Sequence, residues 1–186
     1  MEITDIATDI ALEQFFTRMA TMPRHGDLVA GFLGELWQLK KSSKNVRLFG
    51  ENTRLAYSGE IYSEMFKQAK LIQNPQDLSD EHISELACVM PDIMLFNGNL
   101  YVEKRSKIVG CPNLIVEIWS DSNTIVERKL KTLLYSTSPT TEHWYLEQNS
   151  NIVKRKIGGN KLASQNLTEV LRTESGVLLD LRGLAV

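Results

Sequence analysis

Two carboxylates near the middle of the chain constrain the fold more than any other feature. Asp92 follows Pro91 at the start of an apolar run, and Glu117 interrupts Leu114–Trp119, a segment with the composition of a buried strand. A carboxylate inside a sheet is unfavourable unless it is neutralised, paired with a cation or bound to a metal ion. Any fold of this chain must therefore provide Glu117 with such a partner.

The hydrophobic periodicity predicts an α/β protein with a mixed sheet. Helices are expected at 9–19, 23–41, 59–71, 79–87 and 120–136, and strands at 46–57, 92–96, 100–103, 114–119, 142–148 and 151–157, followed by short strands. Turns are expected at 97–99 and 158–160, and 58–87 is interpreted as an insertion between two strands. A length of 186 residues suits one domain, 1–186.

Composition narrows the class of protein. No apolar run is long enough to span a bilayer, and the N-terminal segment carries acids where a signal peptide is basic, which predicts a cytoplasmic protein. Cys88 and Cys111 lack the spacing of a zinc site or of a disulfide framework. The phosphate-binding glycine loop, the GxSxG nucleophile motif and paired metal-binding histidines are absent from the sequence. The remaining chemistry is that of acids and lysine.

Charge is unevenly distributed along the chain. The net charge is −2, but residues 1–92 hold 9 basic and 14 acidic residues, whereas 93–186 hold 12 basic and 9 acidic residues. Three clusters lie in the second half, and they form either a phosphate-binding surface or ordinary solvated faces. These clusters are Lys104-Arg105-Lys107, Arg128-Lys129-Lys131 and Lys154-Arg155-Lys156. His143, inside an apolar strand, is expected to be a core residue.

Asp92 and Glu117 are placed as antiparallel neighbours would be, so their side chains could converge on one hard cation such as Mg²⁺. The alternative is structural: Asp92 organises the turn after Pro91, and Glu117 pairs with a lysine or arginine from a neighbouring strand. If a cation neutralises Glu117, then Glu117→Gln should leave the stability of the metal-free protein unchanged or raise it.

Five ordered sequence elements support the metal-site interpretation. They are Pro91-Asp92; Glu117-Ile118-Trp119-Ser120; Asp121-Ser122-Asn123; Glu127, Lys131 and Tyr135 at intervals of four; and Glu142-His143-Trp144. This pattern resembles the Uma-type endonuclease family of the PD-(D/E)XK restriction-endonuclease-like superfamily. The resemblance covers 90–147 well and 23–57 loosely, and it does not explain 58–87.

The resemblance implies a restriction-endonuclease-like mixed β-sheet flanked by helices and a Mg²⁺-dependent nuclease that hydrolyses DNA phosphodiester bonds. Asp92 and Glu117 would bind Mg²⁺, for which Mn²⁺ could substitute, and Lys131 would complete the catalytic set. His25 or Glu51 could contribute from the first helix and strand. DNA is the expected partner.

The identity of the lysine follows from the resemblance and conflicts with a pattern argument. The superfamily's usual lysine lies two residues after the strand glutamate, where this chain has Trp119, and the Uma-type pattern selects Lys131 on the next helix. A helical wheel instead places Lys129 within the apolar arc of the helix, which consists of Ile125, Val126, Leu130, Leu133 and Leu134. On that view Glu127 and Lys131 form an exposed i, i+4 ion pair.

Two readings without catalysis remain. One is an inactive nuclease fold that binds nucleic acid or a protein partner. The other is a structural module whose apolar strand edges pair between copies, giving a homodimer.

Overall fold

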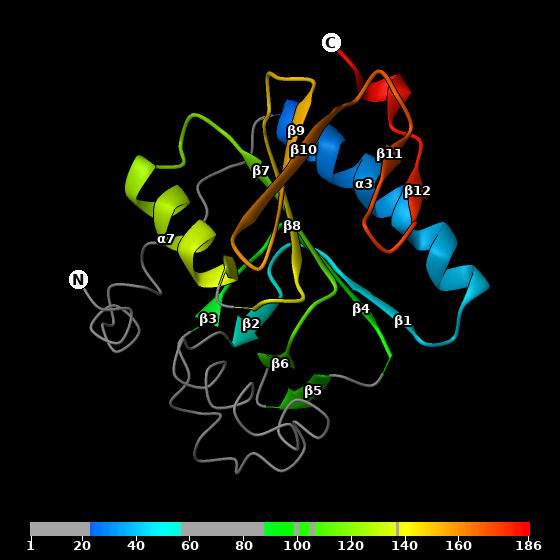
Figure 1. Cartoon of the computed structure of the whole chain (residues 1–186), viewed down its shortest axis with the longest axis vertical. Coiled ribbons are helices and arrows are strands. Elements are labelled where there is room, and N and C mark those ends of the chain that lie inside the picture. The colour runs from blue at the N-terminus through cyan, green and yellow to red at the C-terminus, as the bar shows by residue number, and fades with distance from the viewer. Residues whose placement is uncertain (1–22, 57–87, 99–100, 105–106, 137) are drawn as a thin grey trace.

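The computed structural model describes residues 23–56, 88–98, 101–104, 107–136 and 138–186 (Figure 1). The expected helices at 9–19, 59–71 and 79–87 and the insertion at 58–87 fall outside these residues. No helix within the described ranges has the length and hydrophobicity needed to cross a membrane. The elements are α3 (Pro23–Ser42), β1 (Val46–Phe49), β2 (Arg54–Ala56), β3 (Cys88–Val89), β4 (Ile93–Asn97), β5 (Tyr101–Lys104), β6 (Lys107–Gly110), β7 (Leu114–Trp119), α7 (Ile125–Ser136), β8 (Glu142–Glu147), β9 (Ile152–Ile157), β10 (Asn160–Asn166), β11 (Leu171–Arg172), β12 (Leu178–Leu179) and the 3₁₀ helix η2 (Arg182–Leu184).

A six-stranded mixed sheet forms the centre of the structure, in the order β1-β4-β7-β8-β9-β10. Neighbouring strands are antiparallel except β7 and β8, which are parallel. Parallel neighbours need a crossover connection, and α7 provides it. The mixed sheet expected from the sequence is therefore confirmed.

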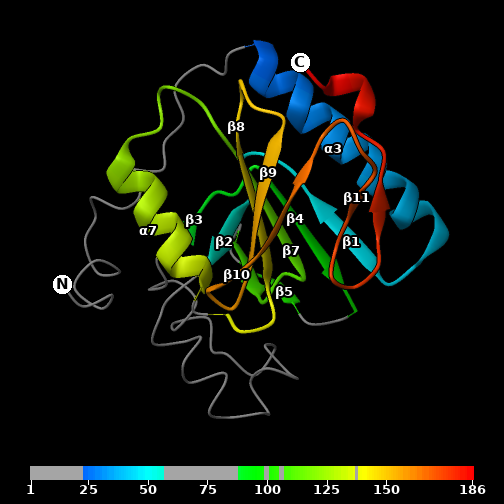
Figure 2. The same cartoon turned by 45° about the horizontal axis from the view of Figure 1, so that its top comes forward.

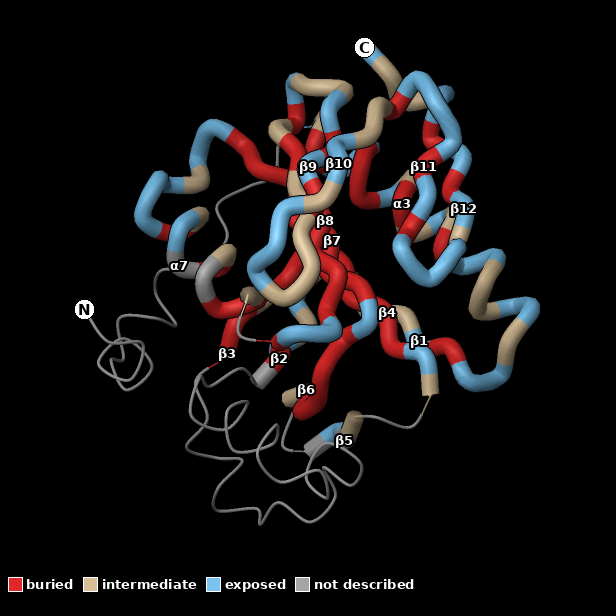
Figure 3. Tube along the Cα trace, in the orientation of Figure 1, coloured by how far each residue is buried: buried red, intermediate tan, exposed pale blue. Residues whose placement is uncertain are grey.

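In the described part of the chain, one α-helix packs against each face of the central sheet (Figures 1 and 2). The helix α3 follows the prediction for 23–41 closely, and its apolar residues pack on one face, where Phe32 and Trp144 meet edge to face with ring centroids 6.3 Å apart. The helix α7 covers the other face through Leu134 and Tyr135. Figure 3 shows the resulting continuous buried layer along β4, β7 and β8.

The segment 46–57 was expected to be one strand, and this was wrong. A turn at 50–53 divides it, with Asn52 in the left-handed region at φ 66°. After this turn the chain leaves the central sheet, and β2 joins a second sheet of order β3-β2-β6-β5. The strands β1 and β2 therefore belong to different sheets, although only four residues separate them.

The strands on either side of the expected turn at 97–99 do not pair with each other. The strand β4 pairs with β1 on one side and β7 on the other, so neither edge is free for β5. The strand β5 pairs with β6 instead. By contrast, the turn at 158–160 is confirmed: Gly158 and Gly159 have φ of 50° and 84° and join β9 to β10.

Candidate active site

Asp92 and Glu117 lie at the same end of two antiparallel strands. Ile93 is opposite Val116 in the β4–β7 register, so the next position outward brings Asp92 opposite Glu117 on one face of the sheet. The backbone N–H of Ile118 donates a 2.6 Å hydrogen bond to Asp92 Oδ2. Both acids are 1% exposed. The β4–β7 register therefore places the two residues opposite each other, as expected of antiparallel neighbours.

The positive partner of Glu117 in this structure is Lys131 on α7. Lys131 Nζ donates to Glu117 Oε2 at 3.1 Å and to the carbonyl oxygen of Met90 at 3.1 Å. The hydroxyl of Tyr135 donates to Glu117 Oε1 at 2.6 Å. The ion pair is buried, with side-chain exposures of 3% and 1%. The alternative in which Glu117 pairs with a strand-borne cation is wrong, because the cation comes from the helix.

This arrangement reverses the expectation for Glu117→Gln in the metal-free protein. The amide would leave the buried ammonium of Lys131 without its counter-charge, and breaking one side of a buried pair is strongly destabilising. The substitution should therefore lower the free energy of unfolding, rather than leave it unchanged or raise it.

The helix α7 presents Lys131 and Tyr135 to Glu117. Residues four apart lie on one helical face, so both side chains reach Glu117 from the same side of the helix. The helix begins at Ile125 and not at residue 120, because the preceding segment caps it: the N–H of Glu127 donates to Thr124 Oγ1 at 3.1 Å. Asn123 Oδ1 accepts from the N–H of Ser120 at 2.8 Å and ties this cap to the end of β7.

The helical wheel gave a wrong view of α7. Lys129 is exposed, whereas Lys131 is 3% exposed. Two apolar residues of the predicted buried arc, Ile125 and Val126, are 71% and 53% exposed. The reading of Glu127 and Lys131 as an exposed ion pair is also wrong, because both residues are buried and their charged atoms lie 4.0 Å apart. The buried carboxylate of Glu117, which no wheel includes, determines which lysine turns inward.

A second group of potential ligands shares Asp92. Among the described residues, donor atoms of His25, Glu51 and Asp92 lie within 4.8 Å of one another, and the group does not include Glu117. His25 Nε2 is 3.5 Å from Asp92 Oδ1, and His25 Nδ1 is 3.6 Å from Glu51 Oε1. These residues come from the first turn of α3, the turn after β1 and the start of β4. From the sequence, His25 and Glu51 were expected only as possible contributors, because no motif links these two residues to Asp92.

The donor set fits a divalent cation. Two carboxylates supply the oxygen ligands that Mg²⁺ and Mn²⁺ prefer, and the imidazole adds a nitrogen, which is more usual for transition metals than for Mg²⁺. Both oxygens of Glu117 accept hydrogen bonds from Lys131 and Tyr135, although a carboxylate oxygen has a second lone pair that a metal could use. Asp92 is therefore the candidate metal ligand that the pair with Glu117 and the group with His25 and Glu51 have in common.

His143 lies behind the site as a neutral core residue. Burial, followed by the nearby charges of Lys156 and Lys131, lowers the pKa of His143 to about 3. Its ring packs against Tyr135 and Tyr145, with centroid distances of 4.9 and 5.2 Å. The expectation that His143 belongs to the core is confirmed.

Two of the basic clusters found in the sequence do not keep all their charges free on one surface. Arg155 points to the opposite face from Lys154 and Lys156 and is buried against Glu142, with Nη2 2.7 Å from Oε1. Arg128 forms two 2.8 Å hydrogen bonds with Glu147. Alternation along a strand and the helical period separate residues that are consecutive in sequence.

The mixed sheet with flanking helices is the α/β architecture expected from the sequence. The chain is similar to a crystal structure described as a putative nuclease belonging to DUF820 from Anabaena variabilis, with a TM-score of 0.62 and 12% sequence identity over 91% of this chain and 86% of that one. No family model matches the sequence, and no curated protein matches it. At this identity the similarity establishes the fold, and the Uma-type family remains a resemblance.

Proposed function

We propose that this protein is a metal-dependent nuclease that hydrolyses DNA phosphodiester bonds. The observation that carries the proposal is the link between the three residues selected from the sequence: Lys131 donates to Glu117, and the next backbone amide on that strand donates to Asp92. A fold shared with a protein described as a putative nuclease supports the same conclusion. Helix and strand residues far apart in the chain thus converge on one end of the sheet.

We assign cation binding to Asp92, with Glu117, His25 and Glu51 as its candidate companions. When bound, a divalent cation such as Mg²⁺ or Mn²⁺ would polarise the scissile phosphate and lower the pKa of a coordinated water. The N–H of Ile118 holds Asp92 Oδ2, which leaves Oδ1 directed toward His25. The protein therefore fixes the orientation of the Asp92 carboxylate before any cation binds.

Lys131 would act on the substrate rather than only on Glu117. Its ammonium group is fixed by Glu117 Oε2 and the carbonyl oxygen of Met90, which hold the positive charge beside the acids where a phosphate or the attacking water would bind. A preorganised cation stabilises the charge that develops on the phosphate in the transition state. Tyr135 holds the other oxygen of Glu117 and so keeps this carboxylate oriented toward Lys131.

One observation favours an inactive nuclease fold as the second candidate. Glu117 is already neutralised by Lys131, and each of its oxygens accepts a hydrogen bond from a protein group, so the fold does not need a metal to compensate its charge. Under this reading the protein binds nucleic acid or a protein partner and does not cleave. The two candidates differ in whether any divalent cation supports hydrolysis.

The test is cleavage of plasmid and single-stranded DNA by purified protein with Mg²⁺, with Mn²⁺, and with a chelator. We expect cleavage with either cation and none with the chelator, and a loss of roughly 10²-fold or more in rate for Lys131→Met. Lys44→Met is the matched control, because it removes the same charge from an exposed position in the turn between α3 and β1, and it should retain activity. Equal activity in both variants would contradict the assignment of Lys131.

Because Lys131→Met leaves Glu117 without its cation, the variant could lose activity simply by unfolding. The double variant Glu117→Gln, Lys131→Met removes both charges of the pair and should recover part of the stability. If that protein is folded by circular dichroism and still inactive, the loss is chemical. A folded and fully active double variant would exclude both residues from the mechanism.

A further inference from the structure

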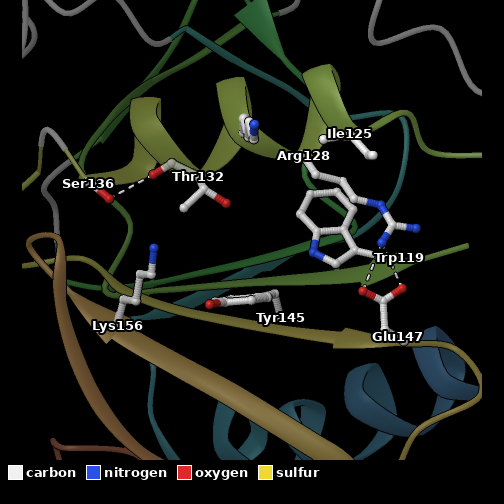
Figure 4. Close-up of a pocket in the computed structure, with 9 residues that line it drawn as sticks. Trp119, Ile125, Arg128, Thr132, Ser136, Tyr145, Glu147 and Lys156 are labelled. Atoms are coloured by element: carbon white, nitrogen blue, oxygen red, sulfur yellow. Dashed lines mark hydrogen bonds and ion pairs between the residues drawn. The ribbon is translucent and has the colours of Figure 1, made fainter.

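A pocket with a volume of about 470 Å³ lies between α7 and the sheet, outside the cluster of acids. Its walls come from β7, β8, β9 and α7. Trp119, Ile125, Arg128, Lys129, Thr132, Ser136, Tyr145, Glu147 and Lys156 line it. Figure 4 shows Tyr145 between Lys156 and Trp119, beneath Thr132 on the helix. The mechanism proposed above uses none of these side chains.

The pocket carries a net positive charge. Arg128 and Glu147 neutralise each other in a two-bond ion pair at one end of it. Among the described residues, neither Lys129 nor Lys156 has an acidic group within the 4.0 Å of an ion pair. Burial and the charge of Lys161 lower the pKa of Lys156, which is the effect expected of a cation without a nearby counter-ion. Two cations are therefore available to an anionic ligand.

The floor of the pocket is aromatic. Tyr145 is partly exposed, and Lys154 Nζ and Lys156 Nζ lie 5.9 and 5.8 Å from its ring centroid. Trp119 contributes a second ring and has the guanidinium of Arg128 5.8 Å from its centroid. Aromatic rings beside lysines and arginines are the elements with which proteins bind single-stranded nucleic acid, by stacking bases and pairing with phosphates.

Trp119 connects the pocket to the candidate active site. It follows Glu117 by two positions on β7, so both side chains emerge from the same face of the sheet about 6.6–6.8 Å apart along the strand. Lys131 Nζ lies 5.5 Å from the Trp119 ring centroid. A strand whose phosphate contacts Lys131 would therefore continue directly into the pocket.

We propose that this pocket binds the unpaired nucleotide next to the phosphate placed at Lys131, with its base on Tyr145 and its phosphate at Lys156 and Lys129. The inference rests on the proposed function, because it takes the substrate to be a DNA strand. A base inside a duplex is stacked on its neighbours and cannot use Tyr145, so the pocket selects single-stranded or locally opened DNA.

The test is binding of a short fluorescein-labelled oligodeoxythymidylate, with a duplex of the same length for comparison, in the presence of a chelator. Wild-type protein should bind the single strand more tightly than the duplex. Tyr145→Leu should weaken single-strand binding at least about fivefold, the lower end of what one stacked base contributes. Tyr145→Phe keeps the ring and should bind as the wild type does.

Salt dependence tests the lysine. Lys156→Gln should lower the slope of log Kd against log salt by about 0.7, the value for one phosphate contact on a single strand. Lys44→Gln is the matched control: Lys44 is exposed in the turn between α3 and β1, remote from α7 in both views (Figures 1 and 2). The control should leave the slope unchanged.

These binding measurements need no catalysis, so they test the nucleotide-binding pocket independently of the proposed nuclease activity. Unchanged single-strand binding in Tyr145→Leu and Lys156→Gln overturns the pocket assignment, even if the protein cleaves DNA. Displacement of the oligonucleotide by polyglutamate at equal charge also overturns the pocket assignment, because this result would show that the pocket binds acidic peptides. Loss of binding in both variants supports the assignment, even if no cation produces cleavage.

Discussion

Two buried carboxylates of this protein each accept hydrogen bonds from a basic and an aromatic side chain. Glu117 has Lys131 and Tyr135, and Glu142 accepts hydrogen bonds from Arg155 and from Trp144 Nε1 at 2.6 Å. Buried pairs of this kind add little net stability, because desolvation offsets their attraction, but they fix side-chain geometry. The first group fixes the candidate catalytic residues, and the second joins two strands under α3.

The buried imidazole of His143 makes a prediction about acid stability. Its pKa is about 3 in the folded protein, below the ordinary value of 6.5, so the unfolded chain binds a proton before the folded protein does. Its contribution to stability should be unaffected above pH 6.5 and should fall by about 1.4 kcal/mol per unit as pH decreases from 6.5 toward 3.

Urea unfolding of wild type and His143→Phe at pH 7 and pH 5 measures this contribution. Phenylalanine keeps a ring between the two tyrosines but cannot titrate. The wild type should lose about 2 kcal/mol more than the variant between these two pH values. An identical loss in both proteins would mean that another group controls acid unfolding.

At the level of the element, α7 determines whether the site exists at all. It connects the parallel strands β7 and β8, and its inner face supplies Lys131 and Tyr135. Twelve residues are few for a helix to be stable alone, so its N-terminal cap and its packing must hold it in register. The cap is thus part of what positions the site.

Thr124→Ala tests this cap. Removing the hydroxyl leaves the N–H of Glu127 without its acceptor and should cost about 1 kcal/mol of folding free energy. Thr124→Ser keeps the acceptor and should restore most of that loss. Chemical denaturation measures both. Equal stability of the alanine and serine variants would show that the cap does not limit the stability of α7.

At the scale of the whole molecule, the C-terminal segment completes the core over α3. The strands β11 and β12 place Leu171 and Leu179 in the same apolar cluster as Leu28 and Leu36 of α3, and Figure 1 shows them alongside the helix. The segment is also tied by polar contacts: Arg24 donates to the carbonyl oxygen of Leu184, and the N–H of Asp180 donates to Glu35 Oε2 at 3.0 Å.

Neighbouring leucines of β12 provide a direct test of this packing. Leu179 is fully buried, so Leu179→Ala should lower the free energy of unfolding by about 2–5 kcal/mol. Leu178 is 60% exposed, and Leu178→Ala should change the free energy of unfolding by less than about 0.5 kcal/mol. Similar losses in both variants, measured by denaturant unfolding, would show that the segment does not contribute to the core in this register.

The sequence alone determined the features that depend on neighbouring residues. The helix at 23–41, the buried strand at 114–119 and the turn at 158–160 were predicted because apolar periodicity and glycine act over a few positions. Asp92 and Glu117 were selected as acids beside or inside apolar strands, and Lys131 was selected through the resemblance to the Uma-type family. Which acid receives which cation was not accessible in this way, because the partners are 14 positions apart on different elements.

Only the tertiary structure decided the rest. Whether 46–57 remains one strand depends on the second sheet, in which β2 pairs with β3 and β6. The partner of Glu117 depends on how α7 crosses the central sheet. His25, Glu51 and Asp92 meet, and Trp119 and Tyr145 line one pocket, because separate elements pack together there. Such contacts depend on the packing of the whole chain, and no short stretch of sequence carries enough information to specify them.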